Sequence, residues 1–145
     1  MSTNEIVLGL MFLTSTLQGD STLASLAPGG VWRGTADPTT PTPYVIISFL
    51  SGTDALTANG VRPMSHLRFQ VKAVGLASNT ASVANASNQV DSLLGGNVGL
   101  RNQSVAGGFI GTCYRDGMLM VDELVTGEKW VNIGGFYILD VEQTS

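Results

Sequence analysis

Charged side chains are scarce in this sequence. Only 12% of its 145 residues are Asp, Glu, Lys or Arg, about half of the ~25% that is usual for soluble domains. The mean hydropathy is nevertheless positive, at +0.23, and polarity comes mainly from Ser, Thr, Asn and Gly. Wide surfaces without charge usually mark interfaces, so we expect an oligomer or a component of a larger assembly.

Cysteine is almost absent as well. Cys113 is the single one, which excludes an internal disulfide and favours a cytosolic folding environment. It lies in an apolar stretch, where a free cysteine is usually a small core hydrophobe. A chain of this length buries about 70% of its unfolded surface. We therefore expect one domain, residues 1–145, that forms its core without disulfide or metal.

The sequence also lacks a basic balance. Its net charge is −4, and its seven Lys and Arg are scattered along the chain. Specific nucleic-acid binding needs a basic footprint and is not expected, although scattered cations can converge in the fold to form a locally basic pore lining. The first apolar run, residues 6–13, is too short to span a bilayer and follows no basic segment. Neither a membrane partner nor a signal peptide is expected.

No catalytic signature is present. P-loop, Gly-x-Ser-x-Gly and dinucleotide fingerprints are all missing. The one histidine, His66, falls on the polar face of a predicted strand, where it is ordinarily solvated. Asp122 and Glu123 are adjacent and would point to opposite faces of a strand. With Asp116 they form one conceivable metal site, but such residues are usually solvated. We predict no enzyme and no catalytic, metal-binding or cofactor-binding residues.

What the sequence does contain is a clear order of helices and strands. A first helix follows the capping-box pattern Ser2-Thr3-Asn4-Glu5, in which the serine would cap, and presents Ile6, Leu10, Leu13 and Leu17 at helical spacing. A short turn of helix at 22–27 is expected to be capped by Asp20 or Ser21. A later helix begins at Ser78 or Asn79, ends at Gly95-Gly96, and carries the stripe Val83, Ala86, Val90, Leu93 and Leu94.

The strands are predicted at 31–34, 44–50, 66–75 and over most of 108–142. Residues 66–75 alternate, with Leu67, Phe69 and Val71 on one face. Asn59-Gly60, Asp116-Gly117 and Thr126-Gly127 are predicted hairpin turns. Runs of strands interrupted by helices favour an α+β fold, with an antiparallel or mixed sheet and two main helices on one face.

Residues 35–50 combine two unusual features. Prolines 38, 41 and 43 fix φ and bias their predecessors toward extended conformations, so the loop at 35–43 is predicted to be stiff. The strand that follows, at 44–50, is apolar on both faces, like residues 136–141. One face would meet the helices, and the other would need a neighbouring subunit or a second layer.

Four segments in this order resemble one known family. They are Pro-Tyr-Val-Ile-Ile-Ser-Phe at 43–49, Leu-Arg-Phe-Gln-Val at 67–71, Val-Asp-Ser-Leu-Leu at 90–94 and Trp-Val-Asn-Ile-Gly-Gly-Phe-Tyr-Ile-Leu-Asp-Val at 130–141. Together they resemble the tail-completion, or tail-terminator, proteins of long-tailed bacteriophages over almost the whole chain. The loop at 35–43 departs from the family by its greater length.

The resemblance implies a structural virion protein without enzymatic activity. Its subunits would form a ring, expected to be hexameric, that caps the tail tube, stops tube polymerisation and joins the tail to the head. The implied partners are other copies of the chain, the tail tube protein and a neck or head-completion protein, and DNA would pass through the lumen of the ring without specific binding. The implied location is the tail or neck of the virion, after assembly in the host cytoplasm.

Seven residues are our candidates for contacts in such a ring. Trp32, Tyr44, Ile46 and Trp130 are predicted at the subunit interface, since aromatic side chains are enriched at binding hot spots. Asp54, Arg62 and Met64 are predicted to reach axial neighbours. If Ile46 faces a neighbour, Ile46→Asp should block assembly; if it is core, the variant should fail to fold.

Two other functions remain open from the sequence. Within a virion, the chain could be a head-closure protein, another neck protein or a minor tail protein. From a different class, it could be a small-ligand-binding or enzyme domain, which would need a pocket with converging polar groups.

Overall fold

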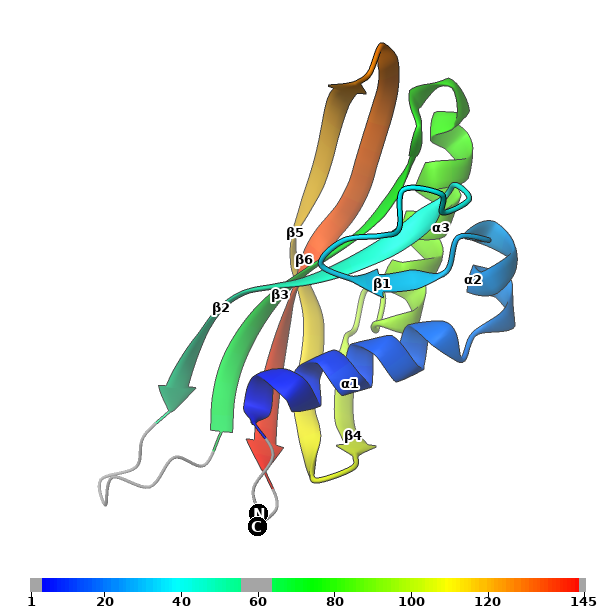
Figure 1. Cartoon of the computed structure of the whole chain (residues 1–145). Helices are drawn as coiled ribbons and strands as arrows, with labels where there is room; N and C mark the ends of the chain where they lie inside the picture. The colour runs from blue at the N-terminus through cyan, green and yellow to red at the C-terminus, as the bar shows by residue number, and fades with distance from the viewer. Residues whose placement is uncertain (1–3, 56–63, 144–145) are drawn as a thin grey trace.

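The computed structural model describes residues 4–55 and 64–143 (Figure 1). Its centre is a strongly twisted six-stranded sheet in the order β1-β2-β3-β6-β5-β4. Helices α1 (Glu5–Gln18), α2 (Ser21–Leu26) and α3 (Thr80–Leu93) pack on one face of this sheet. The predicted α+β fold, with a mixed sheet and helices on one face, is confirmed.

All neighbouring strands are antiparallel except β1, which is parallel to β2. The strands are β1 (Val31–Arg33), β2 (Tyr44–Ala55), β3 (Met64–Leu76), β4 (Leu100–Val105), β5 (Gly108–Val125) and β6 (Glu128–Gln143). A short 3-10 helix, Ala77–Asn79, leads from β3 into α3. Strand β4 was not predicted from the sequence.

The core lies between the sheet and the helices. The alternation predicted for β3 is confirmed, because Leu67, Phe69 and Val71 are all nearly inaccessible. Val83 and Val90 of α3 close the core from the other side. Burying such side chains stabilises the fold by roughly 1.5–3 kcal/mol each. The opposite face of the sheet has no helix on it among the described residues, and we call it the helix-free face.

Helix α1 buries Leu13 and Leu17 of the predicted stripe, but its most buried side extends beyond that stripe. Its buried residues include Leu8 and Phe12, and Val7 and Met11 are 40% and 39% exposed. Apolar residues surround this helix almost completely, so spacing alone did not identify the whole buried side. Gly9 marks the closest approach of the helix to the sheet, because a Cβ there would lie 2.8 Å from the Phe69 ring. The helix therefore lies closely on β3 at Gly9.

The caps of the helices follow the predicted residues in part. The N-cap of α1 is Asn4, whose side chain accepts a hydrogen bond from the N–H of Ile6 (2.8 Å), so the predicted capping by Ser2 is wrong. Asp20 caps α2 as predicted, accepting from the N–H of Leu23 (2.8 Å). The same carboxylate accepts from Gln89 of α3 (2.9 Å), which links the two helices.

Asp116-Gly117 is not a turn, which corrects the sequence prediction. Strand β5 runs through it as one strand of 18 residues, and the register against β6 shifts between Arg115 and Gly117. Since β6 is long enough to pair with all of β5, the extra residue is accommodated as a β-bulge. The turn at Thr126-Gly127 is confirmed, and both residues have positive φ (51° and 81°), as a two-residue hairpin turn requires.

The loop at 35–43 folds back against its own subunit. The carbonyl of Pro43 accepts a hydrogen bond from the N–H of Gly29 (3.1 Å), and a Cβ at Gly29 would meet the carbonyl oxygen of Pro41 at 2.0 Å. Asp37 accepts hydrogen bonds from the backbone and the hydroxyl of Thr39, which lower the pKa of its carboxyl group. The loop is thus tied down by short local contacts.

Candidate functional site

The loop at 35–43 and the helix-free face enclose a groove of about 350 Å³. The loop contributes Ala36, Asp37, Pro38 and Thr40 to its walls. The floor comes from four strands and includes Tyr44, Ile46, Val74 and Trp130. These side chains share one face, because Tyr44 is opposite Val74 on β3, and Val74 is opposite Asn132 on β6.

The groove brings together three of the four predicted interface residues, Tyr44, Ile46 and Trp130. Tyr44 and Trp130 are half-buried. Ile46 is only 8% exposed, so little of its side chain remains for a neighbour. At Ile46, the loop at 35–43 of the same chain covers most of this apolar face.

Trp32 lies one strand further out, on β1, where it is paired with Ile46 of β2. Its indole N–H donates a hydrogen bond to the carbonyl of Gly29 (2.8 Å). The residue lines a separate hollow between β1 and the ends of α1 and α2. Its half-buried position is compatible with an anchoring role in the subunit and with a contact at the sheet edge.

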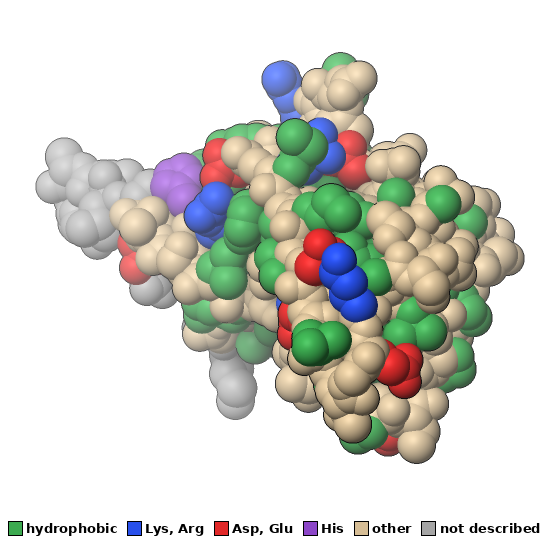
Figure 2. All heavy atoms as spheres, turned by 90° about the horizontal axis from the view of Figure 1, so that it is seen from above, with side chains coloured by type: hydrophobic (Ala, Val, Ile, Leu, Met, Phe, Trp, Pro, Cys, Tyr) green, Lys and Arg blue, Asp and Glu red, His purple; other side chains and the backbone are tan. Residues whose placement is uncertain are grey.

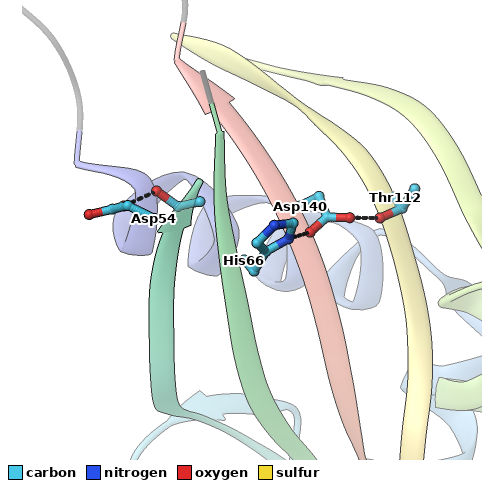
Figure 3. Close-up of polar contacts among 5 residues, drawn as sticks. Asp54, His66, Thr112 and Asp140 are labelled. Atoms are coloured by element: carbon cyan, nitrogen blue, oxygen red, sulfur yellow. Dashed lines mark hydrogen bonds and ion pairs between the residues drawn. The ribbon is translucent and has the colours of Figure 1, made fainter. Parts of the chain in front are cut away.

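The predicted axial candidates belong to the opposite end of the sheet. Met64 is paired with Ala55, and Asp54 with Ser65, where β2 and β3 approach their connection. The hydroxyl of Ser65 donates a hydrogen bond to the carboxylate of Asp54 (2.7 Å) (Figure 3). Arg62 and the predicted Asn59-Gly60 turn lie outside the described residues.

Two polar side chains of the groove are hydrogen-bonded to each other. The Asn132 amide donates to the Glu123 carboxylate (2.6 Å). Burial, with a smaller contribution from the nearby Glu123 charge, raises the pKa of the Tyr44 phenol. Lys72 adds one cation to the wall. The volume is at the lower end of the range for small-molecule pockets.

A polar ladder crosses the other end of the helix-free face. Asp140 of β6 contacts the imidazole Nδ1 of His66 on β3 through one oxygen, and accepts from the hydroxyl of Thr112 on β5 through the other (Figure 3). The carboxylate therefore lies between the histidine and the hydroxyl. A nucleophile–base pair needs direct contact between the hydroxyl and the imidazole, so this ladder ties three strands together instead.

The three acidic residues weighed as a metal site are dispersed. Asp116 pairs with Arg68 (3.1 Å), Asp122 with Lys129 (3.7 Å), and Glu123 with Asn132. Within residues 4–55 and 64–143, no group of three or more His, Cys, Asp or Glu side chains is arranged to hold a metal. No described helix is long and apolar enough to cross a membrane.

Cys113 is fully buried in the core, as predicted. Burial raises the pKa of its thiol to about 12. Because the thiolate is the reactive form, the side chain is inert in the native state.

The outer edge of β5 is the largest exposed apolar feature that sequence reasoning missed. Its exposed residues include Met118 (72%), Met120 (61%) and Leu124 (77%). Seen from above, hydrophobic side chains lie among uncharged ones, with few and separated charges (Figure 2). The sequence signal was the stretch Met-Leu-Met-Val at 118–121, which does not alternate and so has apolar side chains on both faces.

No protein-family model matches the chain, and no curated protein matches it. Its fold is shared with solved structures. One is a chain in a structure described as the virion of a native gene transfer agent particle, with a TM-score of 0.60 and 16% identity. The match covers 90% of this chain and 91% of that chain.

A second solved structure, whose name describes no function, has a TM-score of 0.55 at 16% identity. This match covers 99% of this chain and 99% of that chain. Both matches extend over nearly the whole length, so the likeness concerns the entire arrangement of sheet and helices.

Proposed function

We propose that this chain is a structural protein of a phage-like virion, and within the virion a tail terminator that forms a ring. The observation that carries the proposal is the fold shared with a chain of a gene transfer agent virion over nine-tenths of both chains. The sequence resemblance to tail-terminator proteins supports the finer assignment independently.

The surface of the subunit supports an assembly role. Large apolar side chains are exposed along β5, from Met118 to Val125. Monomeric proteins rarely expose contiguous apolar patches of this kind. A closed ring needs two different complementary surfaces on each subunit. The two lateral edges of this sheet differ, because one is formed by β1 and β2 and the other by β4 and β5.

The chemistry of the described residues is consistent with a structural role. The hydroxyl, imidazole and carboxylate nearest to each other, in Thr112, His66 and Asp140, are arranged with the carboxylate in the middle. Cys113 is buried and protonated at neutral pH. As a terminator, the protein would act by shape: it would occupy the growing end of the tail tube and present a new surface to the neck.

The test is to add the purified protein to growing tail tubes and to measure tube length by electron microscopy. A terminator is expected to form rings and to stop elongation at substoichiometric ratios of ring to tube subunit. A protein that stays monomeric at all concentrations and never associates with tube subunits would sink the proposal.

A head-closure or other neck protein is the alternative within the virion. Cross-linking in intact particles separates the two assignments, because a terminator must yield adducts with the tube protein. Adducts with head and neck proteins alone would favour the alternative.

The groove beside Tyr44 gives a small-ligand-binding function one observation in its favour, since Lys72, Glu123 and Asn132 converge there. Screening a metabolite library by thermal shift would test it. A hit that Trp130→Ala abolishes, together with failure to affect tails, would replace the structural assignment.

A further inference from the structure

The sheet has two open edges, and they lie diagonally opposite each other. On one side, β1 pairs with only three residues of β2, Val45, Ile46 and Ile47. Residues 48–55, which we call the β2 edge, have no strand on that side in the described part of the chain. On the other side, β4 pairs with β5 no further than Cys113. Residues 114–125, the β5 edge, pair with β6 and have no described strand on the side of β4.

Natural edge strands are commonly blunted by lysine or proline, and neither type occurs at 48–55 or 114–125. Each edge has one β-bulge, at 49–51 and at 115–117, and the strand continues on both sides of it. The charged side chains of the β5 edge, at 115, 116, 122 and 123, have partners within the subunit. Leu50 of the β2 edge is 43% exposed, and Met118 and Met120 of the β5 edge are exposed still further. Long edges with exposed apolar side chains are templates for strand addition.

The stagger between the two edges can be read from the register. The middle of the β2 edge, at Ser51 and Gly52, is level through β3 and β6 with Cys113 and Tyr114 of β5. The middle of the β5 edge is at Leu119 and Met120. Counted along β6, and so without the bulged residue of β5, the offset is five residues, or roughly 17 Å at 3.3 Å per residue. If copies were joined edge to edge, each would contribute four strands, β2, β3, β6 and β5, between its own β2 edge and that of the next copy. Measured across the strands, the distance between successive β2 edges would be about 19 Å at 4.8 Å per strand.

These two lengths define a strand tilt of about 40°, within the 35–45° of closed β-barrels. Joined edge to edge with this stagger, successive copies would advance around a closed path without climbing along its axis. The strand directions also agree: β2 and β5 run in opposite senses within the sheet, so a β5 edge meets the β2 edge of the next copy as an antiparallel pair.

We propose that the β5 edge of each copy pairs with the β2 edge of the next, so that the sheets of all subunits join into one continuous barrel. This inference rests on the proposed ring-forming function and names the surfaces that form the ring. Six copies at this tilt would give a backbone diameter of about 50 Å. The contact is heterologous and closes on itself, as a ring requires.

The side chains at the join are compatible with this pairing. Met118 and Met120 are level with Gly135 and Ile133 on β6 and so share the helix-bearing face. On that face of the next copy, the first turns of α1 lie beside the β2 edge, at Phe49 and Gly52. The flexible methionines would therefore gain apolar neighbours, a use for which Met is well suited.

Cysteine pairs test the join directly. Ser51 and Val121 both lie on the helix-free face and are exposed, and the native Cys113 is buried. The full-length Ser51→Cys/Val121→Cys variant, treated at high concentration with a short bismaleimide, is expected to give a ladder of covalent oligomers. Each single variant should give at most a minor dimer. A Val98→Cys/Ser51→Cys variant, with Val98 86% exposed outside both edges, should give no ladder.

Electron microscopy of the same samples separates the possible failures. Rings without a cross-linked ladder, or rings linked equally well through Val98, would overturn the edge pairing and leave the proposed function intact. A monomer with no ladder at any concentration would also overturn the pairing. The proposed function then depends on the separate tail-tube experiment.

Discussion

The phenol of Tyr137 on β6 donates a hydrogen bond to the carboxylate of Asp91 on α3 (3.0 Å), and the guanidinium of Arg115 on β5 lies 3.6 Å from the other oxygen of the same carboxylate. Three elements are thereby joined at one polar point beside the apolar core. Burial, followed by the Asp91 charge, raises the pKa of the phenol, so Tyr137 is a neutral donor across the physiological range.

Tyr137→Phe is expected to lower the free energy of unfolding by about 1–2 kcal/mol, because a hydrogen bond to a charged group is lost while Arg115 still neutralises Asp91. Urea denaturation followed by circular dichroism measures the change. Tyr114→Phe is the matched control, since Tyr114 is 45% exposed and its loss of a hydroxyl should be nearly neutral. Equal effects of the two substitutions would contradict the role of the Asp91 contact.

Gly134→Ala should be among the most damaging single-methyl additions. A Cβ at this position would come 2.2 Å from the carbonyl oxygen of Val71 and 2.5 Å from the Cα of Lys72, so β3 and β6 would have to separate. We expect a loss of about 3 kcal/mol or more. Gly111→Ala is the control, because the atom nearest to a Cβ at Gly111 would lie 3.6 Å away. The melting temperatures of both variants, compared with that of the wild type, test the prediction.

Stability should fall as pH rises above about 9. The pKa of the Cys113 thiol is raised from 9.0 to about 12, so the unfolded chain releases this proton at lower pH than the folded protein. Between the two pKa values the thiol is ionised only in the unfolded chain. The free energy of unfolding therefore falls by up to about 1.4 kcal/mol per pH unit for this one group. Between pH 9 and 10, Cys113→Ala should show a shallower decline in unfolding free energy than the wild type; parallel slopes would refute this account.

Ile46→Asp is expected to unfold the subunit and not only to prevent assembly. Ile46 is 8% exposed, so a carboxylate there would lose most of its hydration, and the cation of Lys72, opposite it on β3, would offset that cost only in part. Val98→Asp, at an 86% exposed position, is the control. A folded, monomeric Ile46→Asp protein would instead mean that the loop at 35–43 moves aside for a neighbour.

Met120→Lys should weaken self-association without weakening the fold. The side chain is 61% exposed, so the change in unfolding free energy should stay within about 0.5 kcal/mol, whereas a lysine on an edge strand opposes pairing with another strand. Analytical ultracentrifugation should show fewer oligomers than for Val98→Lys. Unchanged assembly would argue that the β5 edge remains free.

Local elements could be predicted from the residues alone wherever a pattern is compatible with one structure only. Leu67, Phe69 and Val71 alternate and are buried, the stripe from Val83 to Val90 forms a helix, and Thr126-Gly127 is a turn. In each case the spacing of apolar residues or the backbone conformation depends on neighbours along the chain. The strand, the helix and the turn could therefore be predicted from the sequence.

The tertiary structure alone decided what those elements leave open. Asp116-Gly117 is compatible with a turn or a bulge, and the length of β6 selected the bulge. Apolar residues surround α1 and occupy both faces of β2, and contacts far along the chain settled which of them are buried. The open edges at 48–55 and 114–125 exist because β1 and β4 are short relative to the strands they cover. Edges of this kind are a property of strand order and length together, which no local pattern encodes.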